Sequence, residues 1–441
     1  MSEASEQGRG GRHLIALGIV FIAVGLSAAM ATPYLTLFLD EALGADTARI
    51  AVFLAAAPIS AVIVASLFGR LSDRLPHRRG ILLITALAGV ASSGLSAIVR
   101  NYWLFLLITV TLTAVANAVM PQIFAYARES LGGGSNVAMQ MSTFRMLFSV
   151  SWVAGPPLAS LLLAAGGFAM TYAFSALMYV TVAVVVLAVL RRRQPATAEH
   201  DHLPHAVEAA TWHPAIWLSV GAFTLLYAAS NLAVQALPLF VLRELDAGIG
   251  SAGLLLGLCA GLEIPLMIGF GYLATRVPIH RLLVIGTGCG LAYMVSVAYA
   301  TDVWQLMAAQ LLNAATVAAV GGLGITYVQD LLPRERGRAS TLYTNTIPIG
   351  ALLAGPVLGA AQQTGYRVSF VIGAFLYAGA VLLLFLTNFL NRTRLPKTPG
   401  PATPVIDQRA AGPDSTDSDA PTEDWSGTAS SGAKEFTRHV S

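Results

Sequence analysis

Charged residues are scarce in this sequence. Only 11% of its 441 residues are Asp, Glu, Lys or Arg, whereas 56% are hydrophobic and the mean hydropathy is +0.68. Soluble domains are about a quarter charged, so a soluble protein of this length would lack the charges to cover its surface. A lipid bilayer supplies an apolar solvent instead, and an apolar helix of about 20 residues crosses it. The composition therefore predicts an integral membrane protein.

Cysteine and net charge are also low. The net charge of +3 gives no reason to expect nucleic acid as a partner. The two cysteines, Cys259 and Cys289, both lie inside apolar runs, which excludes a secreted disulfide framework. No Walker-type phosphate loop is present, so ATP is not expected as the energy source. We expect no cofactor and no metal site.

Twelve apolar runs are present, separated by polar breaks. Helices are the expected form, because a backbone in lipid must satisfy its own hydrogen bonds. The first run is too long for the apolar core of a signal peptide. The predicted spans are 14–39, 48–69, 80–99, 102–127, 137–165, 168–190, 213–241, 250–273, 281–300, 304–329, 338–363 and 367–390. The predicted fold class is all-α with twelve transmembrane helices.

The basic residues predict the orientation. With the N-terminus in the cytoplasm, eighteen Arg and Lys residues near the spans face the cytoplasm, and only Arg49, Arg100, Arg243 and Arg367 face the other side. Both termini of a multi-pass protein in the cell membrane are therefore expected to be cytoplasmic.

Five segments follow from this division. They are a cytoplasmic N-terminus (1–13), a six-helix bundle (14–190), a cytoplasmic linker (191–212), a second six-helix bundle (213–391) and a tail (392–441). The tail is rich in Pro, Ser, Thr, Asp and Gly and is expected to be disordered. The linker contains three histidines, but a solvated connection is the better interpretation.

The two bundles carry a weak internal repeat. Short matches recur at a nearly constant shift of 200 to 202 residues: Leu35–Phe38 with Leu237–Phe240, Gly69–Leu71 with Gly271–Leu273, Trp103 and Tyr126 with Trp304 and Tyr327, and Gly155-Pro156 with Gly355-Pro356. Duplicated halves around a midplane cavity are a transporter architecture.

The loop after the second span reads Gly69-Arg70-Leu71-Ser72-Asp73-Arg74-Leu75-Pro76-His77-Arg78-Arg79. This resembles the loop signature of the major facilitator superfamily, in which Gly69, Asp73 and Arg74 would form a cytoplasmic gate. The second copy has Thr275 in place of the acid, so such a gate would be asymmetric. Gly155 and Pro156 resemble the Gly-Pro motif of exporters in that superfamily.

A finer resemblance is to its sugar efflux transporter family, over about residues 14–390. It is carried by Met120–Glu129, Ser151–Ala159, Gly261–Pro265, Gln310–Ala314, Gln329–Pro333 and Thr341–Thr346. The resemblance implies proton-linked export of sugars or glycosides.

One acid and one base lie inside spans, Glu263 in the eighth and Arg145 in the fifth. Charge within a membrane is costly and usually functional. Both lie about 12 to 15 Å from the cytoplasmic ends of their helices, and the superfamily fold places these spans opposite each other. We expect them to pair, with protonation of Glu263 coupling a proton to transport; a static pair that fixes packing is the alternative.

Neutral polar residues in the spans that line the superfamily cavity are candidates for sugar binding. They are Asn117, Gln122, Asn231, Gln235, Gln310, Asn313, Tyr343 and Asn345. Each of these residues could instead form a hydrogen bond between neighbouring helices and have no contact with a solute. As a set they suit an uncharged polyhydroxyl solute.

Three functions compete. The first is export of sugars by proton antiport, and the second is a proton-coupled multidrug efflux pump on the same scaffold. The third is a membrane-embedded enzyme or sensor, which is disfavoured because Glu263 is the one acid inside a span. The expected partners are a small solute, protons and the lipid bilayer, and the expected state is a monomer.

Overall fold

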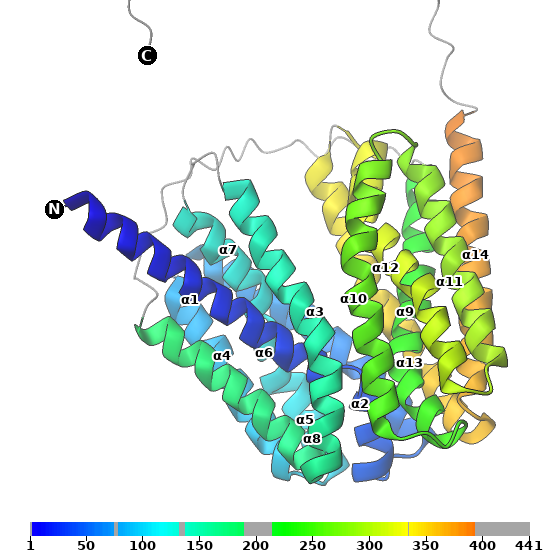
Figure 1. Cartoon of the computed structure of the whole chain (residues 1–441), viewed down its shortest axis with the longest axis horizontal. Coiled ribbons are helices and arrows are strands. Elements are labelled where there is room, and N and C mark those ends of the chain that lie inside the picture. The colour runs from blue at the N-terminus through cyan, green and yellow to red at the C-terminus, as the bar shows by residue number, and fades with distance from the viewer. Residues whose placement is uncertain (1, 75–77, 132–136, 189–213, 334, 393–441) are drawn as a thin grey trace, which may run out of the picture. The chain divides into compact units, whose positions relative to one another are not determined.

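The computed structural model describes residues 2–74, 78–131, 137–188, 214–333 and 335–392, and this part of the chain contains helices and no strand (Figure 1). The predicted linker 191–212 lies outside the described residues, as does the predicted tail 392–441 except for its first residue. The all-helical prediction is confirmed.

The first half of the chain contains α1 (Ser2–Ala31), α2 (Leu35–Leu37), the π-helix η1 (Phe38–Ala42), α3 (Thr47–Arg74), α4 (Arg78–Ile98), α5 (Tyr102–Ile108), the π-helix η2 (Thr109–Thr113), α6 (Ala114–Asn117), α7 (Val119–Leu131) and α8 (Val137–Ala188). The second half contains α9 (Pro214–Arg243), α10 (Ile249–Leu273), α11 (Ile279–Tyr299), α12 (Val303–Leu331), α13 (Arg336–Thr364) and α14 (Arg367–Arg392).

Eleven stretches of the described helices are long and apolar enough to cross a membrane. One of these stretches lies in α8, whose 52 residues would extend about 78 Å as a straight helix, more than two bilayer cores. Gly166 and Gly167 interrupt α8 with non-helical backbone, and Gly167 has a φ of +64°, which favours glycine. The chain reverses at this pair of glycines, as the predicted spans 137–165 and 168–190 require. The prediction of twelve spans is confirmed.

The internal repeat is visible in the packing of the helices. In the first half α8 packs on α1 and α4, and in the second half α14 packs on α9 and α11. Tyr377 of α14 lies against Gly290 of α11, and its hydroxyl oxygen is 3.1 Å from Ser230 of α9.

The first half repeats this arrangement. Tyr179 of α8 lies against Gly89 of α4 and contacts Ser27 of α1. Ser27 and Ser230 are 203 positions apart, Gly89 and Gly290 are 201 apart, and Tyr179 and Tyr377 are 198 apart. The two halves therefore share interior contacts as well as the order of their helices.

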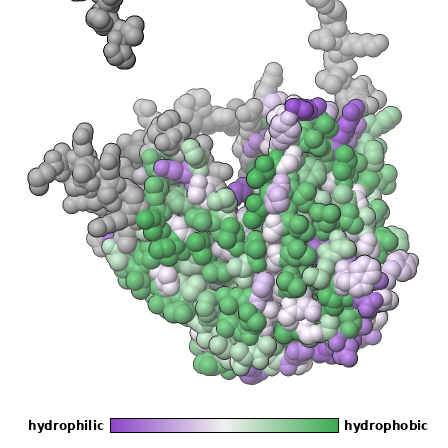
Figure 2. Space-filling model, viewed as in Figure 1, coloured by the Kyte–Doolittle hydropathy of each residue, from purple (hydrophilic) through white to green (hydrophobic). Residues whose placement is uncertain are grey.

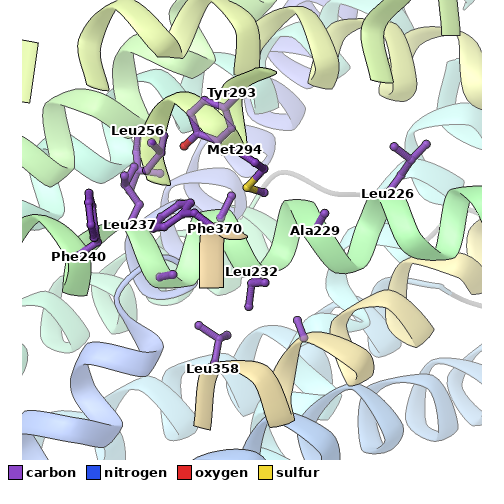
Figure 3. Packing of buried hydrophobic residues seen from close by; sticks show 14 of the residues in the cluster. Leu226, Ala229, Leu232, Leu237, Phe240, Leu256, Tyr293, Met294, Leu358 and Phe370 are labelled. Carbon is purple, nitrogen blue, oxygen red and sulfur yellow. The ribbon is translucent and has the colours of Figure 1, made fainter. Parts of the chain in front are cut away.

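Helix α9 lies at the centre of the second half. Figure 3 shows Leu226, Ala229 and Leu232 along it, with Tyr293 and Met294 of α11, Phe370 of α14 and Leu358 of α13 around it. Each of these side chains is at most 1% exposed. This core fixes the helix that carries two of the predicted site residues, Asn231 and Gln235.

The outer surface of the helices is apolar. On the face seen in Figure 2, hydrophobic residues cover the sides of both halves, and hydrophilic residues gather toward the helix ends. Large side chains such as Ile268 and Phe375 are more than 70% exposed. This distribution fits lipid around the sides of the protein and water at its ends.

Candidate functional site

The two halves meet along a seam made by two helix pairs, α3 with α13 and α8 with α10. Glycine permits the close approach at one end of both pairs. A Cβ atom at Gly253 of α10 would lie 2.7 Å from the carbonyl oxygen of Pro156, and one at Gly359 of α13 would lie 2.6 Å from the carbonyl oxygen of Thr47. Any larger residue at these positions would force the halves apart.

The helices α8 and α10 separate along their length. The nearest atom of α8 to a Cβ built at Gly253, Gly257 and Gly261 is 2.5, 2.7 and 3.8 Å away, in that order. The seam is therefore tight where α10 begins and looser toward its C-terminal end. The predicted Gly-Pro motif lies at the tight part, where Gly155 meets Ala29 of α1 and the carbonyl oxygen of Pro156 accepts from Tyr34 at 3.0 Å.

Polar bonds between the halves gather at the tight end. Thr36 of α2 donates to Gln235 of α9 at 2.8 Å. Asp40 of η1 accepts from Arg243 of α9 and from Gln362 of α13, each at 2.8 Å. Gln362 also bonds to Thr47 and to the carbonyl oxygen of Ala45, and these contacts define the end of the seam that we call the latch end. Neither Thr36 nor Asp40 was singled out by the sequence.

Arg145 and Glu263 both lie at the looser part of the seam. Each is close enough for its charge to act on the other, but no ion pair within 4 Å joins them in the described structure. The register of the antiparallel helices explains the gap. Val153 faces Gly257 and Gly261, so Arg145 lies more than a turn beyond the level of Glu263. The pair expected from helix depth is therefore not in contact in this conformation.

A pocket of about 210 Å³ lies beside Arg145. Its other walls come from α10 and α12 and are apolar or small, including Met267, Phe270, Gly322 and Ile325. The guanidinium is thus the charged group of an otherwise apolar cavity, at the loose part of the seam.

Two tyrosines lie next to this region. The hydroxyl oxygens of Tyr227 on α9 and Tyr343 on α13 are 2.7 Å apart, and Tyr343 also donates to the carbonyl oxygen of Val320 at 3.1 Å. Arg145 acts electrostatically on both hydroxyl groups. The structure therefore brings Arg145, Glu263, Tyr227 and Tyr343 into one neighbourhood. Tyr227 was missed in the sequence because a single tyrosine in an apolar run carries no signal.

The predicted sugar ligands of the second half occupy different environments. Asn231 is half-buried and donates to the carbonyl oxygen of Tyr227 at 2.9 Å. The side-chain oxygen of Gln235 accepts the hydrogen bond from Thr36 at the latch end. Gln310 is fully buried inside the second half, where its oxygen accepts from Asn313 at 3.1 Å. In this conformation Gln310 offers no surface to a solute.

The other candidates are spread over both halves. Asn117 at the end of α6 and Asn345 on α13 are exposed, whereas Gln122 on α7 is 5% exposed. The short helix α6, which ends at Asn117, follows directly on η2 and is separated from α7 by a break at Ala118. π-helical turns often accompany functional sites.

The gate motif is only partly described. Gly69, Asp73 and Arg74 belong to the last turns of α3, but their side chains lie outside the described structure. Arg79, the last arginine of the motif, donates to the carbonyl oxygens of Val186 at 3.1 Å and Leu187 at 2.6 Å. These bonds join the start of α4 to the last described turn of α8.

Comparison with known proteins decides the family. The family model described as Major Facilitator Superfamily matches residues 17–303 and 288–430. The chain belongs to the major facilitator superfamily. It is therefore a multi-pass membrane transporter and not an enzyme, which confirms the interpretation of the motifs and of the repeat.

Individual relatives give a finer comparison. The transporter is 31% identical to "Sugar efflux transporter A" of Dickeya chrysanthemi, over 83% of this chain and 93% of that protein. It is 33% identical to a "Putative sugar efflux transporter" of Deinococcus radiodurans, over 83% and 96%. The predicted resemblance to sugar efflux transporters is confirmed.

Solved structures confirm the fold. The crystal structure of the nucleoside transporter NupG superposes with a TM-score of 0.68 and 15% identity, covering 86% of this chain and 99% of that one. At this identity the likeness concerns the fold alone.

Proposed function

We propose that this transporter exports sugars or glycosides across the cytoplasmic membrane by alternating access, driven by proton antiport. The observation that carries the proposal is the similarity, over more than four-fifths of the chain, to proteins named sugar efflux transporters. The chemistry of the seam agrees with it. Around Arg145 and Glu263 lie tyrosine hydroxyl and asparagine amide groups, which pair with sugar hydroxyls without requiring a charge on the solute.

The proposed coupling centre is Glu263 with Arg145. A carboxyl group at mid-membrane depth, half-buried and within electrostatic reach of one arginine, can exist in a charged and a neutral form. In the charged form it attracts the guanidinium across the seam, and in the neutral form that attraction is lost. Proton binding would thereby change the free energy of the contact between the halves.

The orientation is part of the proposal. The excess of basic residues supports a cytoplasmic location for both termini, and in that orientation the latch end faces outward. The bonds at the latch end then describe a conformation closed to the outside, and the loose part of the seam faces the cytoplasm. The transporter is proposed to work as a monomer.

The apolar pocket supports a second candidate function. Met267, Phe270, Leu323 and Ile325 would suit an amphipathic drug better than a sugar. Uptake into inverted vesicles with an acidic interior separates the two functions, using a panel of labelled mono- and disaccharides beside a cationic dye. Sugar export predicts accumulation of at least one sugar that collapses with the pH gradient. Accumulation of the dye alone would establish the drug pump instead.

A further inference from the structure

The guanidinium of Arg145 has no bonded partner among the described residues. The side chain is exposed at the loose part of the seam, and no hydrogen bond or ion pair joins its nitrogens to another described residue. Glu263 acts on it electrostatically but uses none of its donors. A guanidinium carries its N–H donors in a planar fork. In this conformation Arg145 therefore presents a positive charge and an unused fork to any molecule that enters the seam.

The pocket beside Arg145 is otherwise lined by apolar and small residues. Of the described residues that line it, Arg145 is the one that carries a charge, and none of the others has a hydroxyl or amide side chain. Two glycines of α12 keep the wall open. A Cβ atom at Gly321 or Gly322 would meet Met267, 3.9 or 3.5 Å away, and no other atom within 4 Å. The pocket thus combines one cation with an apolar surface.

This combination selects among classes of solute. A sugar in the pocket would leave most of its hydroxyl groups unpaired, and burial of an unpaired hydroxyl costs free energy. A cationic amphiphile would be repelled by the charge of Arg145. A neutral apolar molecule would fit the walls but would leave the guanidinium partly desolvated without a partner. An apolar molecule that carries a negative charge satisfies both the walls and the guanidinium.

The charge and the size of the ligand follow from the same features. A guanidinium fork matches a carboxylate or a phosphate group. A phosphate monoester carries a charge of about −1.5 to −2 at neutral pH. The excess negative charge would find no second cation among the lining residues, while Glu263 lies within electrostatic reach of Arg145. The volume of about 210 Å³ is below the range of about 300–1,000 Å³ that is usual for drug-sized ligands, so it suits a small molecule and not a diacyl lipid.

We propose that the pocket formed by Arg145 with α10 and α12 is a binding site for a small apolar carboxylate, such as an aromatic acid. The carboxylate pairs with the guanidinium, and the apolar body lies against Met267, Phe270 and Ile325. This site goes beyond the export of sugars, because it adds organic anions to the molecules that the transporter binds. It requires neither a sugar nor a proton gradient.

The test compares two probes that differ mainly in charge. Radiolabelled cinnamate, which is ionised at neutral pH, and its neutral amide cinnamamide are equilibrated with the full-length transporter in nanodiscs of zwitterionic lipid. Empty nanodiscs measure the partition of each probe into lipid. We expect saturable binding of cinnamate that is about tenfold or more tighter than that of cinnamamide, because the ion pair with Arg145 is open to the anion alone. This comparison needs no variant.

Variants assign the binding to the pocket. Arg145→Gln should weaken cinnamate binding about tenfold or more, whereas Arg276→Gln, at an exposed position outside the pocket, should not change it. Gly321→Leu should weaken the binding of both probes because its side chain fills the pocket, and Gly269→Leu, which does not line the pocket, is its control. Glu263→Gln removes a neighbouring negative charge and should bind cinnamate at least as tightly as the wild type.

Three results would overturn the proposal. They are an absence of saturable cinnamate binding, equal binding of cinnamamide and cinnamate by the wild type, and cinnamate binding at the wild-type level by both Arg145→Gln and Gly321→Leu. The comparison of the two probes on the wild type decides the matter even if a variant does not fold. Because neither sugar nor gradient is present, these outcomes stand apart from the result of the sugar panel.

Discussion

Tyr227 and Tyr343 form a directed hydrogen-bond chain beside the seam. Because Tyr343 donates its hydroxyl hydrogen to Val320, the 2.7 Å bond between the two tyrosines requires Tyr227 to be the donor. The chain joins α9, α13 and α12 within electrostatic reach of Arg145. A sugar hydroxyl that bonds to either tyrosine would enter an arrangement whose donors are already oriented.

The first prediction concerns this chain. Tyr343→Phe leaves the hydroxyl of Tyr227 without its acceptor, so the Michaelis constant for sugar transport should rise about fivefold or more, equivalent to ~1 kcal/mol for a net hydrogen bond. Initial rates over a range of sugar concentrations measure it. Tyr172→Phe, which removes a buried hydroxyl from the aromatic cluster of the first half, is the control and should change the constant little. An unchanged constant in Tyr343→Phe would remove the tyrosine chain from the sugar site.

The second prediction concerns the close approach of α8 and α10. A side chain at Gly257 would begin 2.7 Å from Pro157 and 2.8 Å from the carbonyl oxygen of Val153. Gly257→Leu should hold the halves apart at the latch end and reduce transport more than about tenfold, or ~1.4 kcal/mol. Gly269→Leu on the same helix meets no atom within 4 Å of its Cβ and should transport nearly normally. Equal transport by the two variants would show that the tight seam is dispensable.

The third prediction concerns Arg79. Its two bonds join the start of α4 to the last described turn of α8, so Arg79→Gln should lower the free energy of unfolding by about 1–3 kcal/mol. Arg79→Lys should lose less, because it keeps the charge but not the planar fork. Thermal unfolding in detergent measures both. Arg338→Gln removes an exposed pair with Glu335, worth about 0–1 kcal/mol, and serves as the reference. A loss no larger than this reference would show that the bonds of Arg79 to α8 contribute little to stability.

The fold could be predicted well from the sequence because hydropathy is summed over the many residues of each span. Twelve apolar runs, the reversal at Gly166 and Gly167, and the duplicated order of helices all follow from patterns that extend over whole spans. The equivalence of Tyr179 and Tyr377 was not visible, because its members are single residues scattered over three helices in each half. The equivalence becomes recognisable only in the structure, where α8 packs on α1 and α4 as α14 packs on α9 and α11.

The site was predicted less completely, for physical reasons. A polar residue in a span gives no sign of which helix face it occupies, so Gln310, fully buried within its own half, looked equivalent to the half-buried Asn231. Depth along a helix also does not fix register across an interface, which is why Arg145 and Glu263 lie near each other without touching. Asp40 and Arg243 lie at helix ends, 203 residues apart, and a search for charge inside the spans passes over both.

The most direct measurement of the central claim is the pH-gradient dependence of sugar transport by Glu263→Gln, beside the control Glu335→Gln at an exposed position. Inverted vesicles are loaded at acidic pH, and sugar accumulation is compared with passive exchange of the same sugar without a gradient. The account predicts that Glu263→Gln retains exchange but loses accumulation driven by the gradient, while Glu335→Gln keeps both. Gradient-driven accumulation by Glu263→Gln at the wild-type level would contradict it.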